Sequence, residues 1–158
     1  LKKNQMIIDD RIKSLNIKIP EAPKPVGSYT AYTQSGNLIF ISGQISINSE
    51  GKITKGKVGK DLNLTQAQDA AFLCGINIIS QIRAACKNDL NKVKKCVKIT
   101  GYVNSSDDFI DQPKVINSAS ELLKKVFDQA GIHSRAAVSV NSLPLGAAVE
   151  IDAIFELN

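Results

Sequence analysis

The 158-residue sequence contains one histidine, no tryptophan and only three cysteines, which form no Cys-x-x-Cys pair. His133 alone cannot build a histidine-rich metal site, and the cysteine spacing argues against both a disulfide framework and a cysteine-only zinc site. Free cysteines favour a reducing compartment, so we expect a cytoplasmic protein, with an organelle left open. No apolar run reaches the length of a transmembrane helix, and the first residues do not form a signal-peptide core.

Aromatic residues make up 5% of the chain, and the formal net charge is +5. The lysines are scattered except for one cluster at Lys92, Lys94 and Lys95. A basic surface without interleaved aromatic residues is typical of a solvated face and argues against a nucleic-acid partner. The length predicts one domain, and a hydrophobic content of 43% can supply its core.

The segment from Ser134 to Leu157 alternates apolar and polar residues in two runs, which predicts two strands with one buried face each. The breakers at 143–146 suggest that the two strands form a hairpin. In that hairpin Arg135 and Glu150 lie opposite the apolar sets, about 13 Å apart at about 3.3 Å per residue. Two interpretations stay open: a solvated polar face, or two groups that hold opposite ends of a small ligand.

The rest of the chain shows the patterns of helices and strands in turn. The expected elements are a helix over 5–15, an extended connector at Pro20, Pro23 and Pro25, strands over 29–33, 38–41 and 97–104, a helix over 65–86 with a Thr65/Gln68 capping box, and a helix from Pro113 to Gly131. Two helices of this length can cover one face of a mixed sheet. Small or neutral residues on the other face favour a subunit interface there, namely Ala137, Ser139, Thr100 and Ile154.

Four motifs in order carry a resemblance to a known family. They are Pro25-Val-Gly-Ser-Tyr29, Gly36–Ile45, Ile99–Asn104 with Asp108-Phe109, and the C-terminal run Ser134–Val140, Leu143-Pro144 and Val149–Ile154. From about Pro23 to Leu157 the chain resembles the RidA/YjgF/UK114 family, also called endoribonuclease L-PSP-like. The resemblance implies a chorismate-mutase-like α+β fold that forms a homotrimeric barrel, with ligand sites between subunits. It divides the chain into an N-terminal extension, 1–22, and a domain, 23–158.

The family resembled here includes deaminases that hydrolyse 2-imino acids to 2-keto acids and ammonia without a cofactor or metal. An arginine fork suits the substrate carboxylate, and a carboxylate suits the attacking water. The residues that align with the family site are Arg135, Glu150 and Tyr29 as catalytic groups, and Ser42, Gly43, Asn117 and Ala137 as substrate-binding groups. Taken singly, each of these residues also fits an ordinary structural or surface role.

The sequence departs from the family pattern at several points. Ala137 stands where active deaminases often have cysteine, Ser28 replaces a proline, and His133-Ser134 replaces a proline-containing approach to Arg135. Together with the N-terminal extension, these departures suggest a divergent subfamily. Three functions therefore compete: an imine deaminase, a non-catalytic module that binds small keto or amino acids, and a ribonuclease. The last is disfavoured because acid–base cleavage of RNA usually employs histidine, and His133 stands alone.

Overall fold

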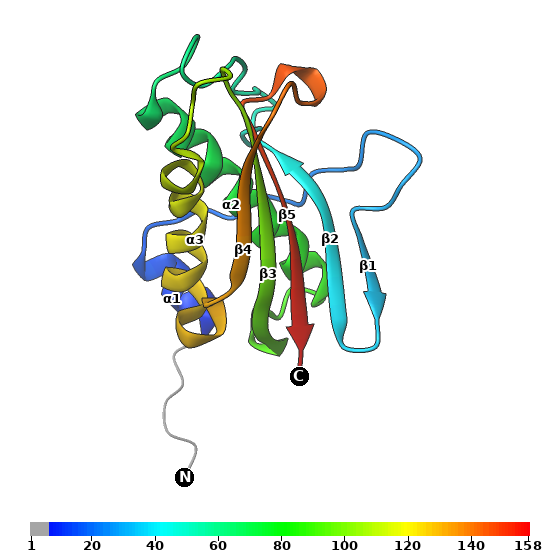
Figure 1. Ribbon diagram of the computed structural model, residues 1–158. Coiled ribbons are helices and arrows are strands. Elements are labelled where there is room, and N and C mark those ends of the chain that lie inside the picture. Colours follow the sequence, from blue (N-terminus) through cyan, green and yellow to red (C-terminus); the bar gives the residue numbers. More distant parts are fainter. Residues whose placement is uncertain (1–6) are drawn as a thin grey trace.

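A computed structural model of the chain describes residues 7–158 and shows helices packed against one mixed sheet (Figure 1). The helices are α1 (Ile8–Ser14), α2 (Leu64–Ala85) and α3 (Gln112–Phe127); the strands are β1 (Tyr32–Ser35), β2 (Leu38–Ile45), β3 (Val93–Asn104), β4 (Ser134–Val140) and β5 (Val149–Leu157). Short 3₁₀ helices are η1 (Leu90–Lys92), η2 (Asp128–Gly131) and η3 (Pro144–Gly146). The predicted order of strands and helices and the α+β class are confirmed.

The sheet has the order β1-β2-β5-β3-β4, so β5 is central and β1 and β4 are its edges. Strand β4 runs parallel to β3, because α3 provides the crossover that a parallel pair requires. The chain then passes over the end of β3 through η3, and β5 pairs antiparallel with both β3 and β2 (Figure 1). The expected hairpin of the last two strands is therefore wrong, since β3 lies between them.

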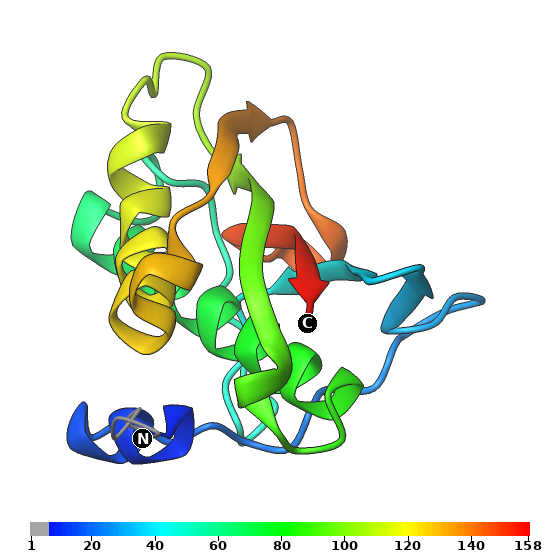
Figure 2. The ribbon, with the colours of Figure 1, turned by 90° about the horizontal axis from the view of Figure 1, so that it is seen from below.

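Helices α2 and α3 pack side by side on one face of the sheet, as Figures 1 and 2 show. Helix α2 contacts β2 and β5, and α3 contacts β3 and β4. The apolar set of β5 predicted from its alternation is buried between these layers, with Val149, Ile151, Ala153 and Phe155 each at most 2% exposed. Strand β5 therefore contributes a fully apolar side to the core from the centre of the sheet. No helix within residues 7–158 covers the other face, which we call the open face.

Strand β4 turns the opposite way from the prediction. Arg135 pairs with Ile99, whose side chain is fully buried under the helices, so Arg135 points to the helix side. Ala137 and Ser139 share that side, and Ala137 packs against the core. Val138, expected in the core, is 44% exposed on the open face. The open face retains Thr100 and Ile154, as predicted, but Ala137 and Ser139 do not belong to it.

The capping box of helix α2 lies two residues before the predicted one. Asn63 is the N-cap, and its side chain accepts from the Gln66 backbone while the Gln66 side chain accepts from the Asn63 backbone. Gln68 instead donates to the Lys114 carbonyl on α3 at 3.1 Å. The spacing of the box was predicted correctly and its position was not, because an asparagine side chain caps as well as threonine does.

Several other boundaries differ from the prediction, since β2 continues to Ile45 and β3 begins at Val93. Tyr29 lies in a loop ahead of β1 and not in a strand, and α3 ends at Phe127, after which η2 continues to Gly131. A Cβ on Gly131 would lie 2.2 Å from the Leu123 carbonyl oxygen, so glycine is required here for a close approach. Pro113 occupies the first turn of α3 as predicted.

The N-terminal segment lies against the helices. Helix α1 matches the helix expected over 5–15, of which residues 5 and 6 lie outside the described chain. Arg11 donates to the Val126 carbonyl of α3 at 3.0 Å, and Arg83 of α2 donates to the Ile19 carbonyl at 3.1 Å. These side chains tie the extension to both helices, and the segment that follows reaches the sheet at Pro23.

Two expectations about composition can be compared with the described residues. All three cysteines are free and buried, namely Cys74, Cys86 and Cys96. This confirms the prediction that Cys74 is a small core residue. Burial raises the pKa of the Cys74 thiol well above its usual value, which keeps that thiol protonated. Among residues 7–158, none of the helices combines the length and the apolar character needed to cross a membrane.

Replacing Gly101 by alanine tests the contact between β3 and α3. The new Cβ would lie 2.4 Å from Cδ1 of Ile116, so we expect Gly101→Ala to lower the free energy of unfolding by about 1–3 kcal/mol. Ile116→Ala removes the opposing atoms, so the double variant should lose less stability than the sum of the two single variants. Urea unfolding at one fixed protein concentration measures all four proteins. Additivity within about 0.5 kcal/mol would show that the two positions do not press on each other.

Candidate functional site

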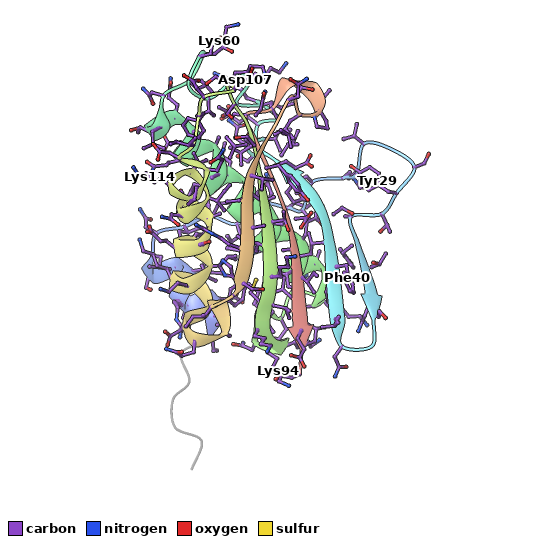
Figure 3. All side chains as sticks on the ribbon, viewed as in Figure 1. Tyr29, Phe40, Lys60, Lys94, Asp107 and Lys114 are labelled. Carbon is purple, nitrogen blue, oxygen red and sulfur yellow. The ribbon has the colours of Figure 1, made fainter. Side chains whose placement is uncertain are left out.

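A cleft of about 360 Å³ opens beside β2 at the β1 side of the sheet. Of the predicted site residues, Tyr29, Gly43 and Glu150 line this cleft together. Figure 3 shows Tyr29 on the loop that projects past the β1 edge, on the side of the molecule away from α3. The rest of the lining is mainly apolar and comes from the connector, β2 and η3: Pro23, Pro25, Val26, Ala31, Ile45, Ile47, Pro144 and Leu145.

A bulge in β2 creates the floor of the cleft. Ile41 pairs with Ala153 and Gln44 pairs with Ile151, so Ser42 and Gly43 form an irregularity opposite a single residue of β5. A Cβ on Gly43 would lie 2.7 Å from Oε2 of Glu150. The absence of a side chain at Gly43 therefore leaves the space that the Glu150 carboxylate occupies.

Glu150 lies on the open face of β5, half-buried at the bulge. Burial raises the pKa of its carboxyl group above 4.5, and the negative charge of Asp152 raises it further. Asp152 is two residues along β5 on the same face and accepts from the Tyr102 hydroxyl at 3.1 Å. A carboxyl group with this environment binds a proton more readily than an exposed glutamate does, which suits exchange of protons with a ligand.

The loop that carries Tyr29 is anchored by Ser42. The Ser42 hydroxyl donates to the Thr30 carbonyl at 2.7 Å, and its backbone N–H donates to the Ala31 carbonyl at 3.0 Å. The Tyr29 hydroxyl accepts from the Val26 backbone at 3.4 Å and closes the loop on itself. Ser42, predicted to bind substrate, is therefore positioned to hold the loop and is not part of the cleft lining.

Two features of the cleft are not predicted by the sequence. Gln81 of α2 is 1% exposed and donates to the Pro23 carbonyl at 2.7 Å and to Oε1 of Gln44 at 3.3 Å. The signal for Gln81 in the sequence is a polar amide side chain next to the apolar stripe of α2. Leu145 at the rim has a φ of 60°, in the region that disfavours leucine, and its side chain is 58% exposed. Nothing in the Leu-Pro-Leu-Gly pattern indicated that this leucine borders a cleft.

Arg135 lies elsewhere, at the β4 edge, where α3 holds its guanidinium. Nη1 donates to Oγ of Ser120 at 3.1 Å and Nη2 donates to the Pro113 carbonyl at 3.2 Å. A guanidinium has five N–H donors, so the remaining ones can still bind a carboxylate through two parallel hydrogen bonds. The hydrogen bonds to α3 thus fix the orientation of the Arg135 side chain. It lies at the β4 edge of the sheet, whereas the cleft opens toward the β1 edge.

The last two predicted site residues also lie on the helix side. Ala137 packs beneath α3 next to Gly101 in the register. Asn117 is exposed and lines a separate groove of about 600 Å³ between α2, α3 and the N-terminal segment, together with Gln68 and Lys114. Figure 3 shows Lys114 on α3, far across the molecule from Tyr29. Asn117 therefore does not join Glu150 within one chain.

The predicted residues thus fall into two groups that a single chain keeps apart. We call Tyr29, Gly43 and Glu150 the acid half-site and Arg135 the arginine half-site. The acid half-site belongs to the open face near edge strand β1, and the arginine half-site to the helix side of edge strand β4. Within residues 7–158, histidine, cysteine and carboxylate side chains form no cluster of three that could hold a metal ion.

Comparison with known proteins agrees with this architecture. Residues 9–157 match the model of the family described as "YjgF/chorismate_mutase-like, putative endoribonuclease". The chain belongs to the YjgF/chorismate mutase-like family. The predicted membership is therefore confirmed, and the match extends into α1, ahead of the residue 23 boundary expected for the domain.

The chain is also similar to individual proteins. The chain is 43% identical over 148 residues to Protein TCP17 of Trypanosoma cruzi, covering 93% of this chain and 92% of that protein. It is 31% identical over 139 residues to the mouse 2-iminobutanoate/2-iminopropanoate deaminase, covering 87% of each. The crystal structure of the protein Atu1372 from Agrobacterium tumefaciens superposes with a TM-score of 0.87 at 43% identity, over 96% of this chain and 94% of that one.

Replacing Asp152 by asparagine tests the electrostatics of the acid half-site. Removal of the neighbouring charge should lower the pKa of Glu150, though it should remain above 4.5 because burial is the larger cause. Titration of the Glu150 carboxyl carbon by NMR measures the shift, with Asp9→Asn on α1 as the control. No difference between Asp152→Asn and the control would contradict the coupling.

The raised pKa of Glu150 also makes the stability of the fold depend on pH. Glu150 holds its proton more tightly in the folded chain, so its contribution favours folding below pH 4.5 and is lost as the pH rises through the raised pKa.

Proposed function

We propose that the chain hydrolyses small 2-imino acids to 2-keto acids and ammonia in clefts that two copies of the chain complete together. The observation that carries the proposal is the separation of the two half-sites: Arg135 lies on the helix side of edge strand β4, whereas Glu150 lies on the open face of central strand β5, in a cleft that opens toward β1. Membership in a family that includes 2-iminobutanoate/2-iminopropanoate deaminases supports the choice of reaction.

Assembly in a ring would unite the two half-sites. Because Arg135 lies at the β4 edge and the cleft opens toward the β1 edge, a head-to-tail contact would set the β4 edge of one copy beside the β1 edge of the next, and such contacts close into rings. Exposed apolar residues beside these edges support the contact: Phe40, Ile132 and Val138 are 40%, 53% and 44% exposed (Phe40 is labelled in Figure 3). The family resemblance favours three copies per ring.

The substrate carboxylate would bind to Arg135. The guanidinium is held by α3 in advance, so little side-chain freedom is lost when it forms two charge-assisted hydrogen bonds. The apolar lining around Ile45, Ile47 and Leu145 suits the substrate side chain, and the C=N carbon is then placed toward Glu150.

Glu150 would manage the protons of the hydrolysis. Its carboxylate accepts a proton from water while the water oxygen bonds to C2 of the protonated imine. The nitrogen then takes that proton from Glu150 and leaves as ammonia when the C–N bond breaks. The new hydroxyl group gives its own proton to the Glu150 carboxylate, which passes it to ammonia, so that the products are the 2-keto acid and ammonium. A pKa raised by burial helps Glu150 both to accept the proton and to return it.

Arg135→Ala should weaken the binding of 2-ketobutyrate and lower kcat/KM for freshly generated 2-iminobutanoate. Charge-assisted hydrogen bonds contribute about 1.5–3 kcal/mol each, so we expect losses of about ten-fold or more. Arg135→Lys should recover only part, because lysine lacks the fork. A coupled assay of keto-acid formation and calorimetric binding measure both quantities. Wild-type binding by Arg135→Ala in an intact assembly would exclude the clamp, whereas binding without turnover in the wild type would favour the non-catalytic module.

Mixed assemblies test whether a cleft takes residues from two copies. Arg135→Ala chains and Glu150→Gln chains are each nearly inactive alone, but in a ring with random neighbours about a quarter of the clefts regain both native residues. We therefore expect co-refolded equal mixtures to recover about a quarter of wild-type turnover, with each variant refolded alone as the control. Light scattering on the same samples should give a trimer. Turnover that stays at the level of the separate variants would place each site within one chain.

A further inference from the structure

His133 is the only histidine of the chain and has no part in the hydrolysis proposed above. It lies between η2 and β4, two residues before Arg135, and is half-buried against α3. Its Nδ1 is 2.7 Å from the Gly131 carbonyl oxygen, and its Nε2 is 2.9 Å from Oγ of Ser120. Ser120 is also the residue that accepts from the Arg135 guanidinium.

The chemistry of these contacts determines the direction of each hydrogen bond. A carbonyl oxygen only accepts, so Nδ1 must carry the ring proton and donate to Gly131. In the neutral ring Nε2 then has a lone pair, which accepts the Ser120 hydroxyl proton. With its proton committed to His133, the Ser120 oxygen presents its lone pairs to Nη1 of Arg135 at 3.1 Å. The chain of donors therefore runs from Arg135 through Ser120 and His133 to the backbone of η2.

The surroundings keep the imidazole neutral. Burial lowers the pKa of His133 below 6.5, and the positive charges of Arg135 on β4 and Lys124 on α3 lower it further, against an opposing contribution from the Gly131 hydrogen bond. The neutral ring is the form that can accept from Ser120. A protonated ring would donate to the same serine oxygen and add a second positive charge beside the guanidinium.

We infer that His133 and Ser120 are positioning residues that hold the Arg135 guanidinium in the orientation that binds a carboxylate. The inference deepens the proposed function and rests on it at one point, the binding of a carboxylate by Arg135. Neither residue touches the ligand. Each acts by limiting the rotamers of Arg135, since a long side chain loses less entropy on binding when it is already held.

Paired substitutions at Ser120 separate the hydroxyl from the packing. Ser120→Ala should raise KM for 2-iminobutanoate and Kd for 2-ketobutyrate by about three- to ten-fold, the loss expected for one hydrogen bond, with kcat within about two-fold. Ser120→Thr keeps a hydroxyl and should restore both constants. Ser118→Ala, in the outer groove of the same helix, is the control and should match wild type. A lower kcat at unchanged KM would indicate damage to the fold and would overturn the inference.

Two substitutions of His133 distinguish its two contacts. Glutamine offers an acceptor about where Nε2 lies, so His133→Gln should keep Ser120 oriented and stay within about two-fold of wild type. Asparagine is shorter and can replace only the contact with Gly131, so His133→Asn should resemble Ser120→Ala. Equal, wild-type KM and Kd for both variants would overturn the inference.

The imidazole itself provides a readout that needs no ligand. With a single histidine, nitrogen-15 NMR gives one pair of ring signals, which should show a neutral ring protonated on Nδ1 at pH 7. Arg135→Gln should raise the pKa of His133, because a neighbouring positive charge is removed. A ring protonated on Nε2 would overturn the inference whatever the binding data show. Loss of ligand binding in Arg135→Ala alone, with Ser120→Ala and His133→Asn unaffected, would overturn it while leaving the proposed function intact.

Discussion

Strand β5 at the centre of the sheet is the constraint on which the rest of the molecule depends. It pairs antiparallel with β2 on one side and with β3 on the other, and its helix-facing side chains are buried under α2. Because β5 holds the middle, β4 must lie at an edge, beside β3. The arginine that precedes β5 in sequence is thereby carried two strand positions away from the glutamate on β5. A chain with this topology contains both groups and cannot bring them together by itself.

The acid half-site is formed by a local irregularity that its neighbours support. The β2 bulge would leave a void above Gly43, and the Glu150 carboxylate occupies that space instead of a side chain at position 43. The cost is partial desolvation of a carboxylate, which appears as a raised pKa. The bulge also frees Ser42 to anchor the Tyr29 loop through two hydrogen bonds, so one irregularity sets both the acid and the loop that faces it.

The helices position the site as well as covering the core. Gln81, buried in α2, holds the connector at Pro23 and so shapes one wall of the cleft, while Ser120 of α3 holds the guanidinium of Arg135. Both contacts join a helix to a segment far away in sequence. They give the N-terminal segment a direct influence on the cleft, since movement of Pro23 would change the wall that faces Glu150.

The elements and their order follow from the sequence because they depend on local physics. Alternation predicted the strand from Val149, spacing predicted the stripes of α2 and α3, and Pro113 predicted the start of α3. Of the residues that the motifs assigned to one site, Tyr29, Gly43 and Glu150 line one cleft, and the others lie outside it. The face on which Arg135 lies was predicted wrongly. Alternation shows that neighbouring residues point to opposite sides of a strand, but it does not show which side meets the helices. Strand neighbours, the bulge at Gly43 and the contacts of His133 with Ser120 were decided only by the tertiary structure, since each depends on residues brought together from distant parts of the chain.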